Sequence, residues 1–295
     1  MLDLRQEKLN RLEMNRVILN SAFVFFITLT FLTSCNESKK TKSDTKKVQW
    51  KFMQTIKLPQ KVRPLSIAIE NDEIWLSDPE NKRVLKINLK GEVLDSITNL
   101  ERPMNIELQD GKLYIPEYLS DRILVMTKNS KDSLSLINHL NAPASVDVLA
   151  KQIAIADFYN HRIVLRNQDK ILVFGEKGSQ NGQFHYPTDV KLYQNEIYVA
   201  DAYNNRVQVF DNIGVFKRII GADAGINVAS GLDITENTIA ITDQENNRVL
   251  IFDLEDNLVQ ILTEKINYPT DVFLIGDELW VANFKINELT IFQKK

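Results

Sequence analysis

The chain has 295 residues, of which 44% are hydrophobic and 25% are charged, and its formal net charge is −3. Its single cysteine excludes a disulfide within one chain, and therefore a small disulfide-held fold. Residues 1–47 hold 9 of the 36 basic and 5 of the 39 acidic residues, so residues 48–295 carry 27 basic against 34 acidic residues. Because phosphate backbones are bound chiefly by cationic side chains, this acidic region is not expected to bind nucleic acid.

Residues 1–34 have the layout of a secretory signal peptide. Arg16 precedes an apolar run over residues 17–32, and the small residues Thr33 and Ser34 follow it. Sixteen helical residues span roughly 24 Å, which is short of a ~30 Å hydrocarbon core, so a permanent membrane helix is the weaker interpretation. Acidic residues ahead of Met14 do not fit the pattern, whereas translation from Met14 would give a conventional basic start.

The next element is Cys35, the only cysteine of the chain. Residues 32–35, Leu-Thr-Ser-Cys, resemble the lipobox of bacterial lipoproteins, in which the cysteine thiol receives a diacylglycerol. The resemblance implies cleavage before Cys35 and a lipid anchor that holds the protein on a membrane of the bacterial cell envelope, outside the cytoplasm. An unmodified thiol in an uncleaved signal anchor is the alternative.

Residues 35–47 are expected to form a tether. The segment after Cys35 has five lysines and no apolar residue, so it cannot bury enough surface to fold. Twelve flexible residues reach about 20 Å. Contact of the lysines with anionic headgroups is a second possibility for this segment.

Residues 48–295 contain six copies of one repeat of 39 to 44 residues. Each copy starts at a proline or alanine that is followed 14 residues later by an acidic residue or asparagine and 19 residues later by an arginine or glutamate. The starting residues are Pro64, Pro103, Pro143, Pro187, Ala229 and Pro269. Short alternating apolar runs separated by Asn, Asp and Gly predict four strands in each copy, and therefore an all-β, six-bladed β-propeller. The last copy lacks a fourth strand, so the segment 48–58 is expected to supply it and close the ring.

The segment from Phe174 to Gly221 closely resembles the NHL repeat, and the other copies resemble it more weakly. This resemblance covers residues 48–295 and implies a six-bladed propeller. It leaves the activity open, because NHL-like propellers include binding modules, RNA binders and a metal-dependent lyase, and related folds include lactonases.

The repeated acidic residues and arginines are expected to be structural pairs within each blade. Residues that recur in every copy are poor candidates for a single catalytic event. The complete Asp–Arg pairs are Asp78 with Arg83, Asp157 with Arg162, Asp201 with Arg206, and Asp243 with Arg248.

Binding residues are expected where the copies differ from one another. The turns between the second and third strands usually carry small or polar residues in the NHL family, but copies two to four carry aromatic residues there, and two histidines should lie near them on the same face. These residues predict a patch that binds a protein, a glycan or a small molecule with a flat ring, although packing over neighbouring blades is the alternative. The predicted binding residues are Tyr118, Phe158, Tyr159, His161, His185 and Tyr203.

A second candidate lies two residues after each starting residue, at the predicted mouth of the channel. Asn105, Asp189 and Asp271 occupy this position in alternate copies and offer oxygen ligands for a cation such as calcium. A cation there would support the alternative function, a lactonase-like hydrolase or lyase. The competing interpretation is that each side chain caps its local turn.

Overall fold

The computed structural model describes residues 49–134 and 139–295. The predicted signal peptide, Cys35 and the tether lie outside these residues. The chain divides into two units, 1–47 and 48–295, of which the second is described here.

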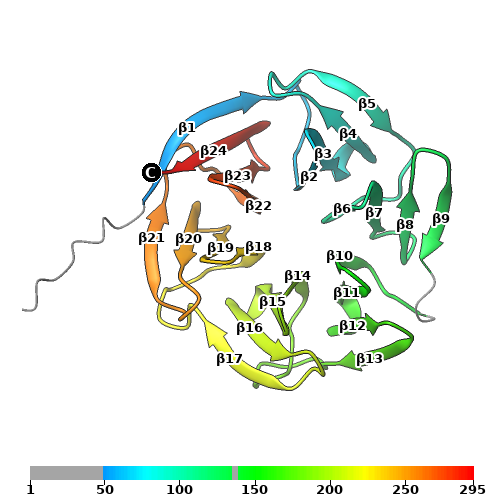
Figure 1. Cartoon of the computed structure of the whole chain (residues 1–295), viewed down its shortest axis with the longest axis vertical. Helices are drawn as coiled ribbons and strands as arrows, with labels where there is room; N and C mark the ends of the chain where they lie inside the picture. The colour runs from blue at the N-terminus through cyan, green and yellow to red at the C-terminus, as the bar shows by residue number, and fades with distance from the viewer. Residues whose placement is uncertain (1–48, 135–138) are drawn as a thin grey trace, which may run out of the picture. The chain divides into compact units, whose positions relative to one another are not determined.

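The described residues form six antiparallel four-stranded sheets arranged as the blades of a ring, which confirms the predicted propeller (Figure 1). The strands of blades one to three are β2 (Ser66–Glu70), β3 (Glu73–Asp78), β4 (Arg83–Ile87), β5 (Val93–Ile97); β6 (Glu107–Gln109), β7 (Lys112–Glu117), β8 (Arg122–Met126), β9 (Lys131–Leu134); β10 (Pro143–Leu149), β11 (Gln152–Asp157), β12 (Arg162–Asn167) and β13 (Lys170–Phe174). Those of blades four to six are β14 (Pro187–Tyr193), β15 (Glu196–Asp201), β16 (Arg206–Asp211), β17 (Phe216–Ile220); β18 (Ala229–Thr235), β19 (Thr238–Asp243), β20 (Arg248–Phe252), β21 (Leu258–Leu262); β22 (Pro269–Ile275), β23 (Glu278–Asn283), β24 (Glu288–Lys294) and β1 (Trp50–Lys57).

Ring closure by the N-terminal strand is also confirmed. β1 pairs antiparallel with β24, from Trp50 opposite Lys294 to Lys57 opposite Glu288, and supplies the fourth strand of blade six. This pairing gives hydrogen-bond partners to the backbone N–H and C=O groups along the outer edge of β24.

The core consists of apolar clusters between adjacent blades. For example, Leu76 of blade one packs with Trp280 of blade six, and Phe184 and Phe210 pack with Ala154 and Leu165 of blade three. Each of the six neighbouring pairs of blades shares such a cluster, including the pair that closes the ring. Burial of alternating residues on both surfaces of each blade therefore holds the ring together.

The two faces of the propeller carry different connections. We call the face with the turns between second and third strands the first face, and the face with the other hairpin turns the second face. Short 3-10 helices form three of the turns on the first face: Pro79–Asn81, Phe158–Asn160 and Ala202–Asn204. β1 begins at the second face, where the Lys294 amide donates to the Asp277 carbonyl at 2.8 Å, and ends at the first face, where the Leu58 amide donates to Asn287 at 2.9 Å.

Candidate functional site

In blades one to five, each turn of the first face is built around a buried acidic residue that ends the second strand of its blade. In blade four the Asp201 carboxylate accepts hydrogen bonds from the His185 amide at 2.7 Å, from Asn204 at 2.9 Å and from Arg206 Nε at 2.9 Å. The Asp201 side chain is fully buried, and Arg206 covers it from the solvent side. One carboxylate therefore fixes the turn, the third strand and the loop that leads into the first strand.

The other predicted pairs have the same arrangement. Their Nε to Oδ2 distances are 2.8 Å for Arg83 and Asp78, 2.7 Å for Arg162 and Asp157, and 2.6 Å for Arg248 and Asp243. Blade two uses Glu117 with Arg122. Blade six has Asn283 and Glu288 at the two positions, and Asn283 donates instead to Thr290 Oγ1 at 2.8 Å.

The last residue of these turns adopts a left-handed conformation and contacts the next blade. Asp121, His161, Asn205 and Asn247 have φ between 52° and 56°. His161 Nδ1 accepts the Tyr186 amide at 3.2 Å, and Asn205 Oδ1 accepts the Val228 amide at 3.0 Å. Burial, the positive charge of Lys177 and the nearby His185 lower the pKa of His161, so the neutral form that can accept this hydrogen bond is favoured.

The structure brings the predicted aromatic residues together in one contiguous cluster across blades two, three and four. We call it the aromatic patch, and it consists of Tyr118, Phe158, Tyr159, His161, His185, Tyr186 and Tyr203. Tyr186 lies at its centre, with its ring centroid 4.8 Å from Phe158, 4.6 Å from His161 and 5.1 Å from Tyr203. Tyr186 is not among the six predicted binding residues, but the structure places it at the centre of the patch.

Members of the patch differ in their exposure to solvent. Tyr203 is 57% exposed and Tyr159 is 46% exposed, whereas His161 is only 8% exposed. The Arg102 guanidinium lies over the Tyr118 ring, 5.1 Å from its centroid. Two tyrosine rings are therefore available to a partner, and the remaining rings support them from below.

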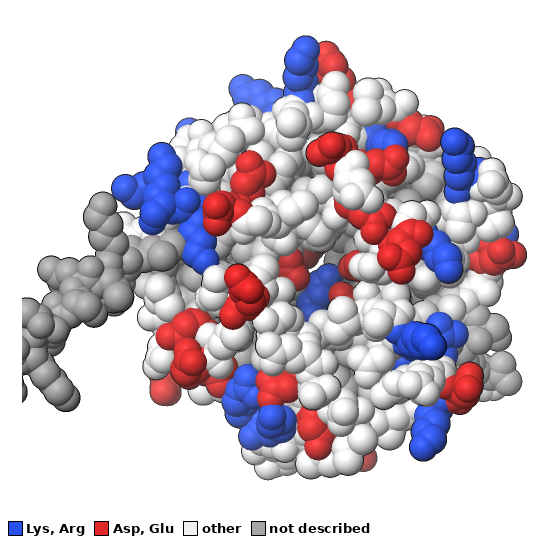
Figure 2. Space-filling model, in the orientation of Figure 1, with Lys and Arg blue, Asp and Glu red and all other residues white. Residues whose placement is uncertain are grey.

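A group of charged residues lines the central channel, which sequence reasoning missed. Four residues after the repeat start, blades two to five carry Glu107, Asp147, Lys191 and Asp233, one from each first strand. Lys191 Nζ lies 3.3 Å from Glu107 and 3.2 Å from Asp147. Figure 2 shows the opening as a hollow in which basic and acidic side-chain atoms lie side by side. A comparison of equivalent positions in the six copies would have found this group.

The pKa values of these channel residues are shifted by burial and by one another. Burial raises the pKa of Glu107 to about 8, against the lowering effect of Lys191. Burial likewise raises the pKa of Asp233 to about 6. Burial alone would lower the pKa of Lys191, but the surrounding carboxylates, Glu107 and Asp147 first, raise it well above its ordinary value.

The three predicted cation ligands lie two residues earlier on alternate blades. Asp189 Oδ2 accepts the Leu232 amide at 2.9 Å, and Asp271 Oδ2 accepts the Ile67 amide at 2.8 Å, each from the next blade. Asn105 donates to the Thr188 carbonyl at 3.3 Å. Asp189 and Asp271 therefore satisfy backbone donors of the first strand in the neighbouring blade, whereas Asn105 of blade two bonds to the first strand of blade four. A cation at Asn105, Asp189 and Asp271 stays a prediction.

Residues 49–134 and 139–295 contain neither a cluster of metal ligands nor a membrane-spanning helix. No group of three or more His, Cys, Asp or Glu residues there is arranged to hold a metal ion. The same residues include no helix of sufficient length and hydrophobicity to span a bilayer.

Comparisons with known proteins agree with this architecture. Residues 184–210 match the NHL repeat family model, so the chain contains an NHL repeat within a six-bladed propeller. A 72-residue segment is 39% identical to Protein brain tumor of Drosophila melanogaster, and the match covers 23% of this chain and 7% of that protein. Activities of that longer protein therefore do not transfer directly.

Solved structures with the same fold differ in sequence. Virginiamycin B lyase from Staphylococcus aureus has a TM-score of 0.61 at 16% identity, covering 83% of this chain and 99% of that chain. A protein of unknown function from Bacteroides thetaiotaomicron has a TM-score of 0.63 at 13% identity, covering 84% of this chain and 72% of its own. The WD40 propeller domain of Doa1 has a TM-score of 0.58 at 16% identity, covering 77% of this chain and 78% of its own. At these identities the likeness shows the fold alone.

Proposed function

We propose that this protein is a binding module that captures its partner on the aromatic patch of the first face. The observation that carries the proposal is the patch itself, in which seven rings from three blades are contiguous and Tyr159 and Tyr203 are exposed. Tyrosine provides a rigid apolar ring together with a polar hydroxyl, and it is enriched among residues that dominate binding energy. A flat ring, such as the ring of a sugar, fits such a surface.

We further propose that a lipid on Cys35 holds this module at the bacterial cell envelope. The proposal is supported by the resemblance of residues 32–35 to a lipobox and by the lysine-rich segment after them. The propeller begins at its second face, because Gln49 pairs with Lys295 and Lys294 contacts Asp277 there. The described part of the propeller therefore starts on the face opposite the aromatic patch.

Replacement of the two exposed tyrosines tests the binding proposal. We expect the Tyr159→Ala/Tyr203→Ala protein to lose binding to the glycans that the wild type retains on a glycan array, at an unchanged melting temperature. The matched control is Leu89→Ala/Ile213→Ala, because these side chains are 63% and 65% exposed outside the patch. A parallel loss of binding and melting temperature would assign the tyrosines to packing, and unaltered binding would exclude the patch.

The anchor has its own test, which does not depend on the ligand. The Cys35→Ala protein should move from the membrane fraction to the soluble fraction and lose the mass of the lipid. The Ser38→Ala protein, altered within the tether, should remain on membranes. Retention of Cys35→Ala protein on membranes would contradict a lipid anchor.

The second candidate is a cation-dependent hydrolase or lyase at the mouth of the channel. Buried carboxylates with raised pKa values favour it, because such groups gather at catalytic sites. Calcium, magnesium, manganese or zinc should then raise the melting temperature in a dose-dependent manner, and Asp189→Asn/Asp271→Asn should abolish that shift. The absence of any shift in the wild type would leave the binding module as the function to pursue.

A further inference from the structure

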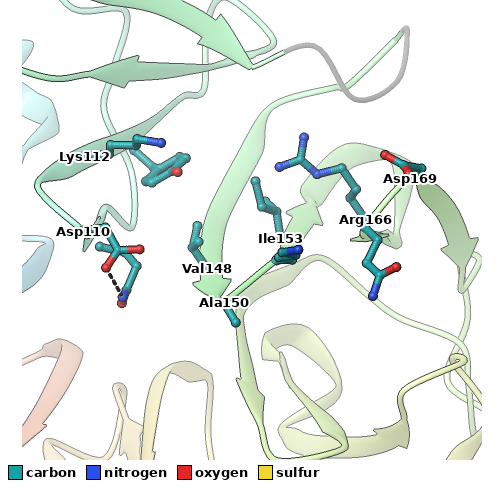
Figure 3. Close-up of a pocket in the computed structure, with 11 residues that line it drawn as sticks. Asp110, Lys112, Val148, Ala150, Ile153, Arg166 and Asp169 are labelled. Carbon is teal, nitrogen blue, oxygen red and sulfur yellow. Dashed lines mark hydrogen bonds between the residues drawn. The ribbon is translucent and has the colours of Figure 1, made fainter.

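A polar cavity opens between blades two and three at the second face, on the opposite side from the aromatic patch. Its volume is about 450 Å³, which is within the usual range for small-molecule sites. Asp110, Lys112 and Tyr114 line it from blade two, and Val148, Ile153 and Arg166 line it from blade three (Figure 3). Charged and apolar groups therefore meet in one small space.

Arg166 departs from the repeat at this position. The strand register places Arg166 opposite Ile153, and the same register places Ile87, Met126, Phe210, Phe252 and Phe292 at the equivalent position of the other blades. In those five blades the side chain is apolar and packs into a cluster between adjacent blades. In blade three an arginine stands in its place, and the cavity lies beside it.

The charge of Arg166 has no carboxylate partner among the described residues. None of the ion pairs or side-chain hydrogen bonds of residues 49–134 and 139–295 involves Arg166 or Lys112. Figure 3 shows the charged ends of Lys112 and Arg166 directed toward each other across the upper part of the cavity. Arg166 is half-buried and Lys112 is exposed, and two cations that face each other are stabilised by an anion between them.

The neighbouring cavity between blades one and two provides a contrast. There Lys86 lies 2.6 Å from Glu73 and the Glu70 carboxylate accepts the Asp110 and Gly111 amides at 2.8 Å, which leaves Lys128 as the one lining cation without an ion pair among the described residues. An unsatisfied cationic pair is therefore a property of the cavity at Arg166 and is not shared by its neighbour.

We propose that this cavity binds a small organic anion whose carboxylate or phosphate group lies between Arg166 and Lys112. The guanidinium offers paired N–H donors that match either group. Val148 and Ile153 provide an apolar wall for the carbon skeleton of the ligand. Asp110, at the other end of the cavity in Figure 3, disfavours a second negative charge at that end. The ligand class is therefore a short carbon chain with one anionic group, a carboxylate or a phosphate, at one end.

Calorimetric titration of the full-length protein with butyrate, glycerol phosphate, succinate and inorganic phosphate tests this proposal. We expect saturable binding of butyrate or glycerol phosphate, and these two arms distinguish a carboxylate from a phosphate ligand. Succinate and inorganic phosphate should bind at least tenfold more weakly, because the first adds a second charge and the second lacks a carbon chain. Absence of saturable binding by every anion at millimolar concentration would overturn the proposal.

Two variants at position 166 distinguish a loss of the binding site from a loss of folding. Arg166→Gln should weaken binding at least tenfold, as expected on loss of a charge-assisted pair. Arg166→Phe restores the residue found in blades four to six, so it should raise the melting temperature while it abolishes binding. The control Lys90→Gln removes an exposed lysine outside the cavity and should bind as the wild type does. Undiminished binding by both variants at position 166, or an equal loss in Lys90→Gln, would contradict a site at Arg166.

Discussion

Lys191 compensates the carboxylates that the first strands bury in the channel. Its ammonium group lies within 3.3 Å of Glu107 and Asp147, and its side chain is only 16% exposed. Removal of one partner from a buried ionic group leaves an uncompensated charge, which is more costly than the loss of a surface ion pair.

We therefore expect Lys191→Met to lower the free energy of unfolding by about 3 kcal/mol at pH 7, measured by chemical denaturation. The loss should be smaller at pH 5, where Asp233, whose pKa burial raises to about 6, takes up a proton. Lys90→Met is the matched control, because its side chain is exposed and should cost less than about 0.5 kcal/mol. Equal stability of both variants at pH 7 would contradict this role for Lys191.

Glu107 should make the stability of the propeller depend on pH. Its pKa is raised to about 8, chiefly by burial, whereas the unfolded chain has the ordinary value near 4.5. Between these values the folded state retains a proton that the unfolded state has released, so the unfolding free energy falls as pH rises. Glu107→Gln removes this contribution, and its stability should fall by about 3 kcal/mol less than that of the wild type between pH 5 and 8. Parallel curves for the two proteins would show that Glu107 does not titrate in this range.

At the scale of the element, the repeated turn depends on its buried acid. Asp201 accepts hydrogen bonds from the His185 amide, Asn204, Arg206 and Gln208 Nε2, the last at 3.0 Å. Because all of these donors lose their acceptor together, Asp201→Ala should cost about 3 kcal/mol in thermal or chemical unfolding. Tyr203→Ala, in the same turn but 57% exposed, should cost less than about 1 kcal/mol. A loss for Asp201→Ala no larger than that for Tyr203→Ala would contradict this function of the acid.

The sequence predicts these turns well because their chemistry recurs. Six copies with the same spacing reveal the strands, the pairs such as Asp157 with Arg162, and the place where the aromatic residues gather. The sequence does not reveal the hydrogen bonds between adjacent blades. Asp189 accepts the Leu232 amide and His161 accepts the Tyr186 amide, each from the next repeat. Arg166 was missed because its importance depends on strand register and on the empty space beside it.

At the scale of the whole molecule, β1 makes blade six complete. Ile56 of β1 belongs to the apolar cluster shared by blades one and six, and Trp50 belongs to that shared by blades five and six. Trp50 also exchanges hydrogen bonds of 2.8 Å with the Gln260 side chain of blade five. The strand therefore contacts both neighbours of its own blade.

Deletion of β1 should destabilise the ring far more than deletion of the tether. A protein from which residues 48–57 are removed should lose its single cooperative unfolding transition, whereas one lacking residues 36–47 should retain it. Differential scanning calorimetry of the two proteins provides the measurement. One sharp transition at the wild-type temperature in the first protein would show that closure contributes little.

The pairing of β1 with β24 also governs the order of events during synthesis. β1 can pair only after β24 has been synthesised. The Leu58 carbonyl at the end of β1 accepts a hydrogen bond from Asn287, 229 residues further along the chain. Contacts between residues so distant in sequence form slowly, and until then exposed strand edges are prone to aggregate. Five blades can therefore assemble while the chain is still growing, but the ring closes only after its final residues have been made. A chain exported in an unfolded state would complete this step only after it has crossed the membrane.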